Sequence, residues 1–170
     1  MISQEEALKL VRNTSRYAHA LMVSRMMKEL ARVFGEDENE WVLVGLLHDL
    51  DYDEVKNDMR KHGVAAAEKL KERLPENCIH AIKAHDYRTG IKAKSKLDSA
   101  LIATDSLASL IEKMGKTAKE LTAEKLQAEL ESISVNRPWY KSNVLKCEEI
   151  GLRMDDFLRL CLNSLKERKM

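Results

Sequence analysis

Residues 41–50, WVLVGLLHDL, decide the fold, because they place His48 and Asp49 at the end of a run of apolar residues. The apolar run predicts a buried helix, and a buried imidazole and carboxylate without partners would be costly. A shared proton or a shared metal ion can offset that cost, since imidazole and carboxylate together bind Zn, Fe, Mn or Ni. We therefore expect other histidines and acids of the chain to be partners of this pair.

The composition is typical of a globular helical protein. The chain has 170 residues, of which 44% are hydrophobic and 34% are charged, a length that suits a single domain over residues 1–170. Six glycines and two prolines are few, whereas Leu, Ala, Lys, Glu and Met are plentiful, which favours helices over strands. We expect an all-α, compact multi-helix bundle with short C-terminal helices.

Charge and hydropathy bear on the partners of the protein. Basic and acidic residues number 29 and 28, so nothing in the balance points to a nucleic acid polymer or a membrane. No apolar run approaches the length of a membrane span, and the N-terminus lacks an apolar targeting core. Cys78, Cys147 and Cys161 follow no CxxC spacing, which indicates free thiols in a reducing compartment and a cytoplasmic protein. The oligomeric state is left open.

Helical periodicity recurs along the chain and is interrupted by polar segments. Asn39 is expected to cap one helix, and Gly35, Pro75 and Gly115 are expected to end helices. Polar or broken patterns predict loops at about residues 51–54, 87–96 and 136–140. The expected helices cover about residues 3–11, 17–33, 41–50, 59–74, 78–86, 97–114, 122–133, 144–150 and 154–169.

Two further polar residues lie on apolar helix faces. His19 is one turn before Met22 on the apolar stripe of residues 17–33, and Asp105 is one turn after Leu101. A lone residue of this kind is usually a satisfied core residue. No Arg or Lys lies within the apolar stretches to neutralise Asp49 and Asp105, so for the set as a whole a metal site and satisfied core residues both stay open.

The order of these residues resembles the HD-domain superfamily of metal-dependent phosphohydrolases. The similarity covers about residues 14–115, leaving about residues 116–170 as a C-terminal helical extension, and its layout is that of the branch with two additional histidines. The tail at about residues 137–165 also resembles small HD hydrolases. The matching segments are LLHDLDY at 46–52, HG at 62–63, AIKAH at 81–85 and ALIATD at 100–105.

The resemblance implies a set of metal ligands. The ions implied are one or two divalent transition metals, namely Fe, Mn, Zn, Co or Ni, with Mg as a further option. Asp86 stands where some relatives have a second adjacent histidine, so it would ligate or orient. His80 lies about 140° around a helix from His85, which places it beside the site or on the surface. The implied ligands are His19, His48, Asp49 and Asp105 for the first ion, with Asp49 as the bridge to a second ion held by His62 and His85.

Other residues near these ligands are candidates for catalysis and substrate binding. Tyr52 stands where many two-metal relatives have a lysine, and it is a catalytic candidate together with Asp51 and Asp53, which are proton-transfer groups or else solvated loop acids. Trp139 and Tyr140 would pack against helices or stack on a base. A candidate phosphate clamp, or else an ordinary basic loop, consists of Arg88, Lys92, Lys94 and Lys96.

The leading hypothesis from the sequence is a metal-dependent phosphohydrolase. It would act on a small phosphorylated molecule, a nucleotide first among them, through a metal-activated water. Two alternatives stay open: a mixed-valent di-iron oxygenase of the same superfamily, and a non-catalytic nucleotide-binding HD protein. The choice of substrate is expected to lie in residues 52–53 and in the basic segment 88–96.

Overall fold

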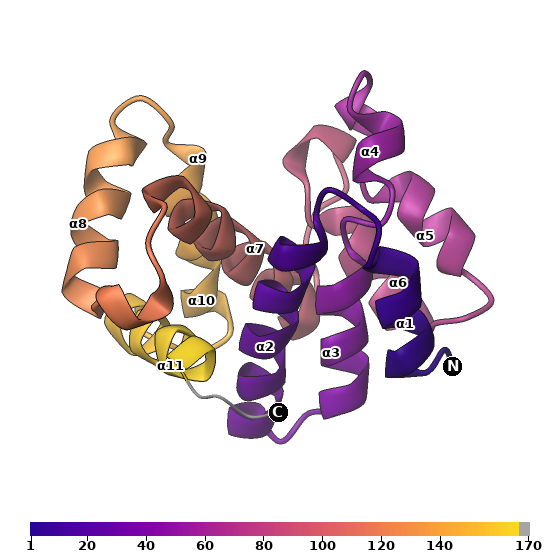
Figure 1. Ribbon diagram of the computed structural model, residues 1–170, viewed down its shortest axis with the longest axis horizontal. Helices are drawn as coiled ribbons and strands as arrows, with labels where there is room; N and C mark the ends of the chain where they lie inside the picture. The colour runs from indigo at the N-terminus through magenta and orange to yellow at the C-terminus, as the bar shows by residue number, and fades with distance from the viewer. Residues whose placement is uncertain (167–170) are drawn as a thin grey trace.

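The structure is a computed structural model of the 170-residue chain, and it describes residues 1–166. Helices dominate and the described residues contain no strand, which confirms the all-α class (Figure 1). Three single turns of 3₁₀ helix are η1 (Met59–Lys61), η2 (Tyr87–Thr89) and η3 (Ala118–Glu120). The α-helices are α1 (Gln4–Val11), α2 (Tyr17–Phe34), α3 (Glu38–Leu47), α4 (Tyr52–Val55), α5 (Val64–Leu70), α6 (Glu76–Ala84), α7 (Lys96–Met114), α8 (Ala123–Ser134), α9 (Trp139–Val144), α10 (Lys146–Glu149) and α11 (Met154–Lys166).

Helix α2 is the central element, packing against α3, α7 and α11 (Figure 1). Its buried residues recur at the three- and four-residue spacing expected from the sequence and include Met26, Met27 and Leu30. Gly45 of α3 lies against Ser24 of α2, where an added Cβ would come within 2.6 Å of the Ser24 Cα. A glycine therefore lets the two helix backbones approach closely.

Helix α7 agrees closely with the expected helix at residues 97–114. Ser95 and Asp98 form a reciprocal capping box at its start, and Gly115, with φ of 62°, ends it in the left-handed conformation. The helix is buried over most of its length. Asp105 consequently lies in the middle of a long, mostly buried helix that is capped at both ends.

The C-terminal helices α8, α9 and α10 pack against α7, and α11 packs against α2 and α8, on the left of Figure 1. Pro138 precedes the first residue of α9, so the expected break at residues 136–140 is too long: Trp139 and Tyr140 are helical, with ring centroids 6.2 Å apart. Pro138 itself suits a helix start because that position needs no backbone N–H. The expected last helix is confirmed to Lys166, and its final residues 167–169 lie outside the described residues.

Helix α3 differs from its expected bounds at both ends. Asp37, not Asn39, is the N-cap, since its carboxylate accepts a hydrogen bond of 3.0 Å from the Glu40 N–H. The helix ends at Leu47, and the chain turns there instead of continuing to residue 50. His48 and Asp49 therefore lie at the turn that follows the helix.

The segment between α3 and α6 departs most from expectation. Residues 59–74 were expected as one helix, but the chain forms η1, an extended His62 with ψ of 129°, Gly63 with φ of 81°, and then α5. Residues 51–54 were expected as a loop or a frayed turn, and the chain forms the four-residue helix α4 there. The helix expected at residues 78–86 begins and ends two residues earlier, and η2 lies within the expected loop at 87–96.

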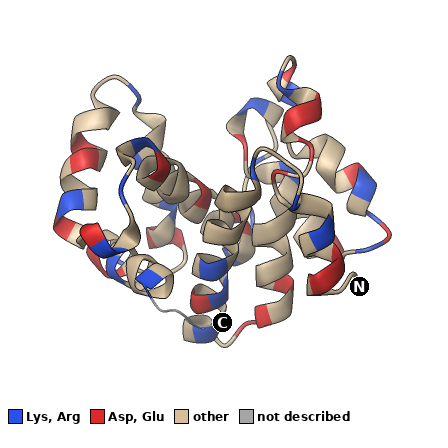
Figure 2. Ribbon diagram, in the orientation of Figure 1, with Lys and Arg blue, Asp and Glu red and all other residues tan. Residues whose placement is uncertain are grey.

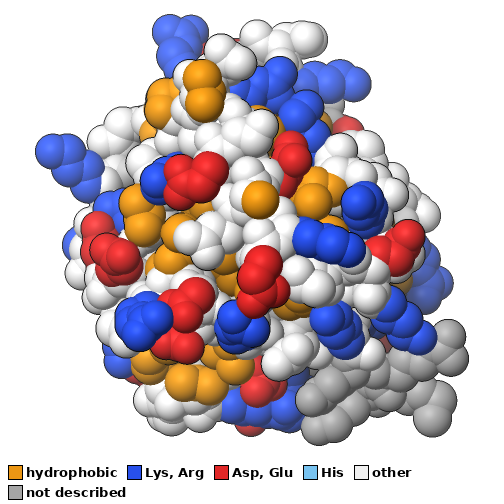
Figure 3. All heavy atoms as spheres, turned by 90° about the vertical axis from the view of Figure 1, so that its left-hand side faces the viewer, with side chains coloured by type: hydrophobic (Ala, Val, Ile, Leu, Met, Phe, Trp, Pro, Cys, Tyr) orange, Lys and Arg blue, Asp and Glu red, His pale blue; other side chains and the backbone are white. Residues whose placement is uncertain are grey.

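The surface carries both signs of charge. Lys and Arg are interspersed with Asp and Glu along the helices (Figure 2), and the face made by the C-terminal helices shows both signs with hydrophobic side chains between them (Figure 3). Over residues 1–166, no helix combines the length and the apolar character needed to cross a membrane.

The cysteines are all buried as free thiols, as expected. Burial raises the pKa of the Cys78 thiol and of the Cys147 thiol to about 12. Because the thiolate is the nucleophilic form, these cysteines are unreactive near neutral pH.

Candidate metal centre

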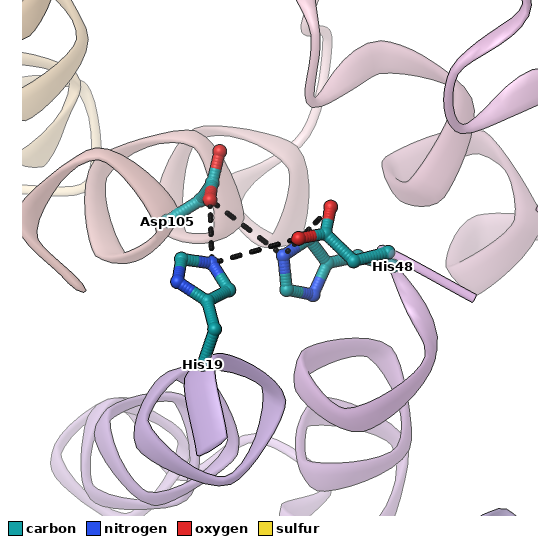
Figure 4. A group of neighbouring side chains, drawn as sticks. His19, His48 and Asp105 are labelled. Carbon is teal, nitrogen blue, oxygen red and sulfur yellow. Dashed lines mark hydrogen bonds and ion pairs between the residues drawn. The ribbon is translucent and has the colours of Figure 1, made fainter. Parts of the chain in front are cut away.

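Four side chains meet where the start of α2, the turn after α3 and the middle of α7 come together (Figure 4). One donor atom from each lies within 4.8 Å of the others. His19 Nε2 is 2.9 Å from Asp105 Oδ1 and 3.8 Å from Asp49 Oδ2, and His48 Nε2 is 3.6 Å from Asp105 Oδ1. We call His19, His48, Asp49 and Asp105 the first donor group.

A second donor group adjoins the first and consists of Asp49, His62 and His85. His62 Nε2 lies 3.0 Å from Asp49 Oδ1, and His85 Nε2 lies 3.5 Å from the same oxygen. The two imidazole Nε2 atoms are 3.1 Å apart. Asp49 belongs to both groups, so its carboxylate lies between two sets of histidines.

All four histidines are oriented in the same sense. Each ring places its Nδ1 against an oxygen acceptor, which makes Nδ1 the protonated nitrogen of the neutral ring and leaves the Nε2 lone pair facing the shared space. The acceptors are Glu112 Oε2 for His19 at 3.1 Å, the Gly45 carbonyl for His48 at 2.9 Å, Asp51 Oδ1 for His62 at 2.9 Å and the Ile82 carbonyl for His85 at 2.6 Å.

The donor atoms fit a metal ion. His48 Nε2 is buried and has no hydrogen-bond partner among the described residues. With Nδ1 protonated in both rings, the His62 and His85 Nε2 lone pairs point at each other and require a proton or a cation between them. Nitrogen and carboxylate donors in one buried space suit Fe, Mn, Zn, Co or Ni. The first donor group can hold one ion and the second group another.

The two aspartates favour their charged forms despite burial. Burial raises the pKa of Asp49, but its interactions with His48, His62 and His85 outweigh that effect, so the pKa lies well below its usual range. Burial also opposes ionisation of Asp105, and contacts with His19 and His48 lower its pKa strongly. Both carboxylates are therefore anionic near neutral pH, as metal ligands must be.

Two of the histidines have raised pKa values, so they favour their charged forms as well. Burial lowers the pKa of His19, but hydrogen bonds with Asp105 and Glu112 outweigh it and raise the pKa to about 9. Burial likewise opposes protonation of His62, whose bonds with Asp49 and Asp51 raise its pKa to about 10. Without a metal ion the centre therefore holds protons, and an ion that binds must displace them.

Arg16 is the main correction to the sequence analysis, which expected no buried cation beside the acids. Its Nε donates to Asp49 Oδ2 at 2.7 Å, its Nη1 lies 3.6 Å from Glu112 Oε2, and its guanidinium lies 5.0 Å from the centre of the Tyr52 ring. The side chain is only 21% exposed. The sequence could have indicated this role, because Arg16 precedes His19 by three residues and residues at that spacing lie on one helix face.

The sequence analysis also did not predict that two carboxylates, Glu112 and Asp51, hold histidine rings. Glu112, which binds His19, stands seven residues after Asp105 and so faces the same way two turns later in α7. Asp51 was expected as a loop acid or proton-transfer group, but it is fully buried. Besides the His62 ring it accepts backbone N–H bonds from Gly63 at 2.8 Å and Ala66 at 2.9 Å. It shapes the turn that presents His62.

The other catalytic candidates lie at the edge of the centre. The Tyr52 ring stands edge-on to His62, with centroids 5.5 Å apart, and is half-buried. Asp53 is exposed and accepts hydrogen bonds from the Ser15 N–H at 2.8 Å and the Ser15 hydroxyl at 2.5 Å. These bonds lower the pKa of Asp53. Both oxygens of Asp53 are thus directed to Ser15.

The structure places Asp86 and His80 outside both donor groups. Asp86 accepts hydrogen bonds from the Arg88 backbone N–H at 2.8 Å and from the Arg88 Nε at 2.9 Å. His80 Nδ1 lies 2.8 Å from Asp98 Oδ2, at the contact between α6 and α7. Neither residue touches the shared space around Asp49.

The four cations of the expected phosphate clamp do not converge. Arg88 is paired with Asp86, and Lys96 is 3.2 Å from Glu36 and stacks over Phe34, roughly 22 Å along α2 from His19. The Lys92 and Lys94 side chains make no ion pair within residues 1–166. The cation in direct contact with the centre is the unexpected Arg16.

Comparison with protein families places most of the chain in one of them. The family model described as HD domain matches residues 16–134, from the residue that contacts Asp49 through α8. No curated protein and no solved structure matches the chain.

Proposed function

The chain belongs to the HD-domain family, and from this premise we propose that it is a metal-dependent phosphohydrolase acting on a small phosphorylated molecule. The proposal depends above all on one observation. Four imidazole Nε2 atoms and the carboxylates of Asp49 and Asp105 face one buried space, in which His48 Nε2 has no hydrogen-bond partner among the described residues.

The first donor group would hold one divalent ion and the second donor group another, with Asp49 shared. Such ions lower the pKa of a bound water and withdraw charge from a phosphoryl oxygen. The protein's own contribution is to fix the ligands: Glu112, Gly45, Asp51 and Ile82 hold the four rings by Nδ1, so that no ring turns away from the centre.

Arg16 is suited to binding the phosphate group of a substrate. Its Nε and Nη1 face Asp49 and Glu112, while its Nη2 has no partner among the described residues. Guanidinium binds phosphate oxygens through parallel N–H bonds, and the two carboxylates fix its orientation. An anion bound there would lie beside the donor groups.

Aromatic side chains at the edge of the centre support a nucleotide as the substrate. Tyr52 lies between the Arg16 guanidinium and the His62 ring, and Tyr87, two residues after His85, is 66% exposed. A nucleobase can stack on such rings while its phosphate reaches Arg16. This arrangement favours a nucleoside monophosphate over a simple sugar phosphate.

A screen of phosphate release tests this proposal. Protein stripped of metal is reloaded separately with Mn, Co, Ni, Fe, Zn or Mg and assayed on nucleoside monophosphates and sugar phosphates. We expect phosphate release from a nucleotide with at least one metal, loss of release in His85→Gln, and retention in His80→Gln, a control in α6, the helix that ends just before His85.

Two outcomes would overturn the proposal in different ways. Oxygen uptake by the iron-loaded protein without phosphate release would identify the oxygenase alternative, which can use the same ligands. Tight nucleotide binding without turnover under every metal would identify a non-catalytic binding protein.

A further inference from the structure

A cavity lies away from the metal centre. It has a volume of about 360 Å³ and is bounded by α1, α2, α3 and α11, which lie next to one another across the lower half of Figure 1. No residue of either donor group lines it. Its volume falls in the range of small-molecule sites, which begins at about 300 Å³.

The floor of the cavity is aliphatic. Leu8, Leu21, Val42 and Leu46 line it from three helices, and among the described lining residues there is no aromatic ring. Nucleobases are commonly bound by stacking on aromatic side chains. An aliphatic floor without such a ring suits an alkyl chain better than a base.

The rim of the cavity is cationic. Arg25, Lys28 and Arg32 line it from one face of α2, at spacings of three and four residues, and blue bands recur along the lower part of α2 in Figure 2. The lining acid, Glu29, is 3.6 Å from Arg32, which is also 3.1 Å from Glu38.

Two of these cations are available to bind a ligand. Arg25 has no acidic partner within residues 1–166 and is exposed, and Lys28 is only loosely paired, with its Nζ 3.9 Å from Glu38 Oε2. Cations next to an apolar floor attract an amphipathic anion.

We propose that this cavity binds a small molecule made of an alkyl chain and one anionic head group, either a carboxylate or a phosphate. The chain lies on the leucine and valine floor, and the head group binds between Arg25 and Lys28. This inference does not rest on the proposed function, since the cavity shares no residue with the metal centre.

Calorimetric titration of the whole chain tests the proposal with matched amphiphiles, kept below the concentrations at which they form micelles. Decanoate and decyl phosphate are the anionic probes, decan-1-ol and decyltrimethylammonium are the uncharged and cationic controls, and AMP is the control with a base. We expect one-to-one saturable binding of the anions, with the controls at least about tenfold weaker. The tighter of the two anions identifies the head group.

Substitutions test whether the amphiphiles bind in this cavity. Arg25→Ala removes a head-group contact and is expected to weaken binding about tenfold, whereas Arg159→Ala, on α11 and paired with Glu124, should not change it. Val42→Phe fills the floor and should also weaken binding, with thermal unfolding checking that each variant folds. The proposal fails if no anion binds saturably, if decyltrimethylammonium binds equally well, or if Arg25→Ala and folded Val42→Phe bind like the parent.

Discussion

His62 Nε2 lies 3.1 Å from His85 Nε2, while each ring directs its Nδ1 to an oxygen acceptor. Two neutral imidazoles in this arrangement would point lone pairs at each other, so the contact is stable only with a proton or a cation between them. Asp49, 3.0 Å from the His62 nitrogen, provides the negative charge that either would need. The contact explains why the metal-free centre retains protons and why a metal can replace them.

The metal-free protein should lose stability as the pH rises. The folded-state pKa of His19 is raised to about 9 and that of His62 to about 10, from an ordinary value of 6.5. A raised pKa stabilises the fold fully below the unfolded value, and this contribution disappears as the pH passes through the folded value. We expect the difference in melting temperature between the metal-free parent and the His19→Gln/His62→Gln variant to shrink from about pH 7 to about pH 10.5. A constant or growing difference would contradict these protonation states.

Arg16→Ala should impair substrate binding more than metal binding. The guanidinium contacts Asp49 and Glu112 but belongs to neither donor group. Loss of a charged hydrogen bond to phosphate corresponds to roughly 10- to 100-fold in kcat/KM, and we expect most of it in KM. Arg16→Lys should restore little, because an ammonium group cannot replace the fixed fork of N–H donors. Unchanged KM in Arg16→Ala, with metal content equal to the parent, would exclude a role in phosphate binding.

Gly63→Ala should damage the centre, whereas Gly90→Ala should not. Both glycines have positive φ, but Gly90 (φ 74°, ψ 0°) is in the left-handed region, where an L-residue costs about 1–2 kcal/mol, whereas Gly63 (φ 81°, ψ −34°) lies outside it and costs more. At Gly63 the new Cβ would also lie 2.4 Å from the Ile82 carbonyl oxygen and 3.0 Å from the His85 ring, while at Gly90 nothing lies within 4 Å. In urea unfolding, Gly63→Ala should lose more stability than Gly90→Ala. In metal titration, only Gly63→Ala should bind metal more weakly than the parent. Equal losses would show that this contact is unimportant.

Asp51→Asn and Asp53→Asn separate a buried structural acid from an exposed one. Asp51 accepts bonds from the His62 ring and from two backbone N–H groups, and an amide cannot accept all three, which leaves a buried donor unpaired at about 1–3 kcal/mol. Asp53 is exposed and contacts Ser15 at the surface, so its substitution should change the free energy of unfolding less. If Asp53→Asn keeps full activity, Asp53 is not the proton-transfer group. If Asp51→Asn unfolds at the same urea concentration as the parent, our account of the His62 turn is wrong.

The sequence predicted most of what depends on local pattern. The stripe in α2 that orients His19 and the bounds of α7 around Asp105 follow from helical periodicity and from capping residues, both of which act within a few residues. The apolar residues before His48 likewise predicted a buried helix end. The six expected ligands are brought into two adjoining groups, while their occupation by metal remains a prediction.

What the sequence did not predict depends on tertiary contacts. The turn at Gly63 forms because Asp51, twelve residues earlier, accepts its N–H, and periodicity alone favoured one continuous helix at residues 59–74. Arg16 precedes the apolar stripe and resembles an ordinary surface cation until α3 brings Asp49 to it. The basic residues at 88–96 are close in sequence, yet Arg88 and Lys96 pair with acids in different parts of the fold.

The central claim is that Asp49 joins two metal sites, and anomalous diffraction from crystals grown with Mn or Co tests it most directly. We predict two anomalous peaks, one among His19, His48 and Asp105 and one between His62 and His85, with the Asp49 carboxylate between them. His80→Gln should retain both peaks and His85→Gln should lose the second. A single peak, or no peak near His48 and Asp105, in crystals with excess metal would contradict the account.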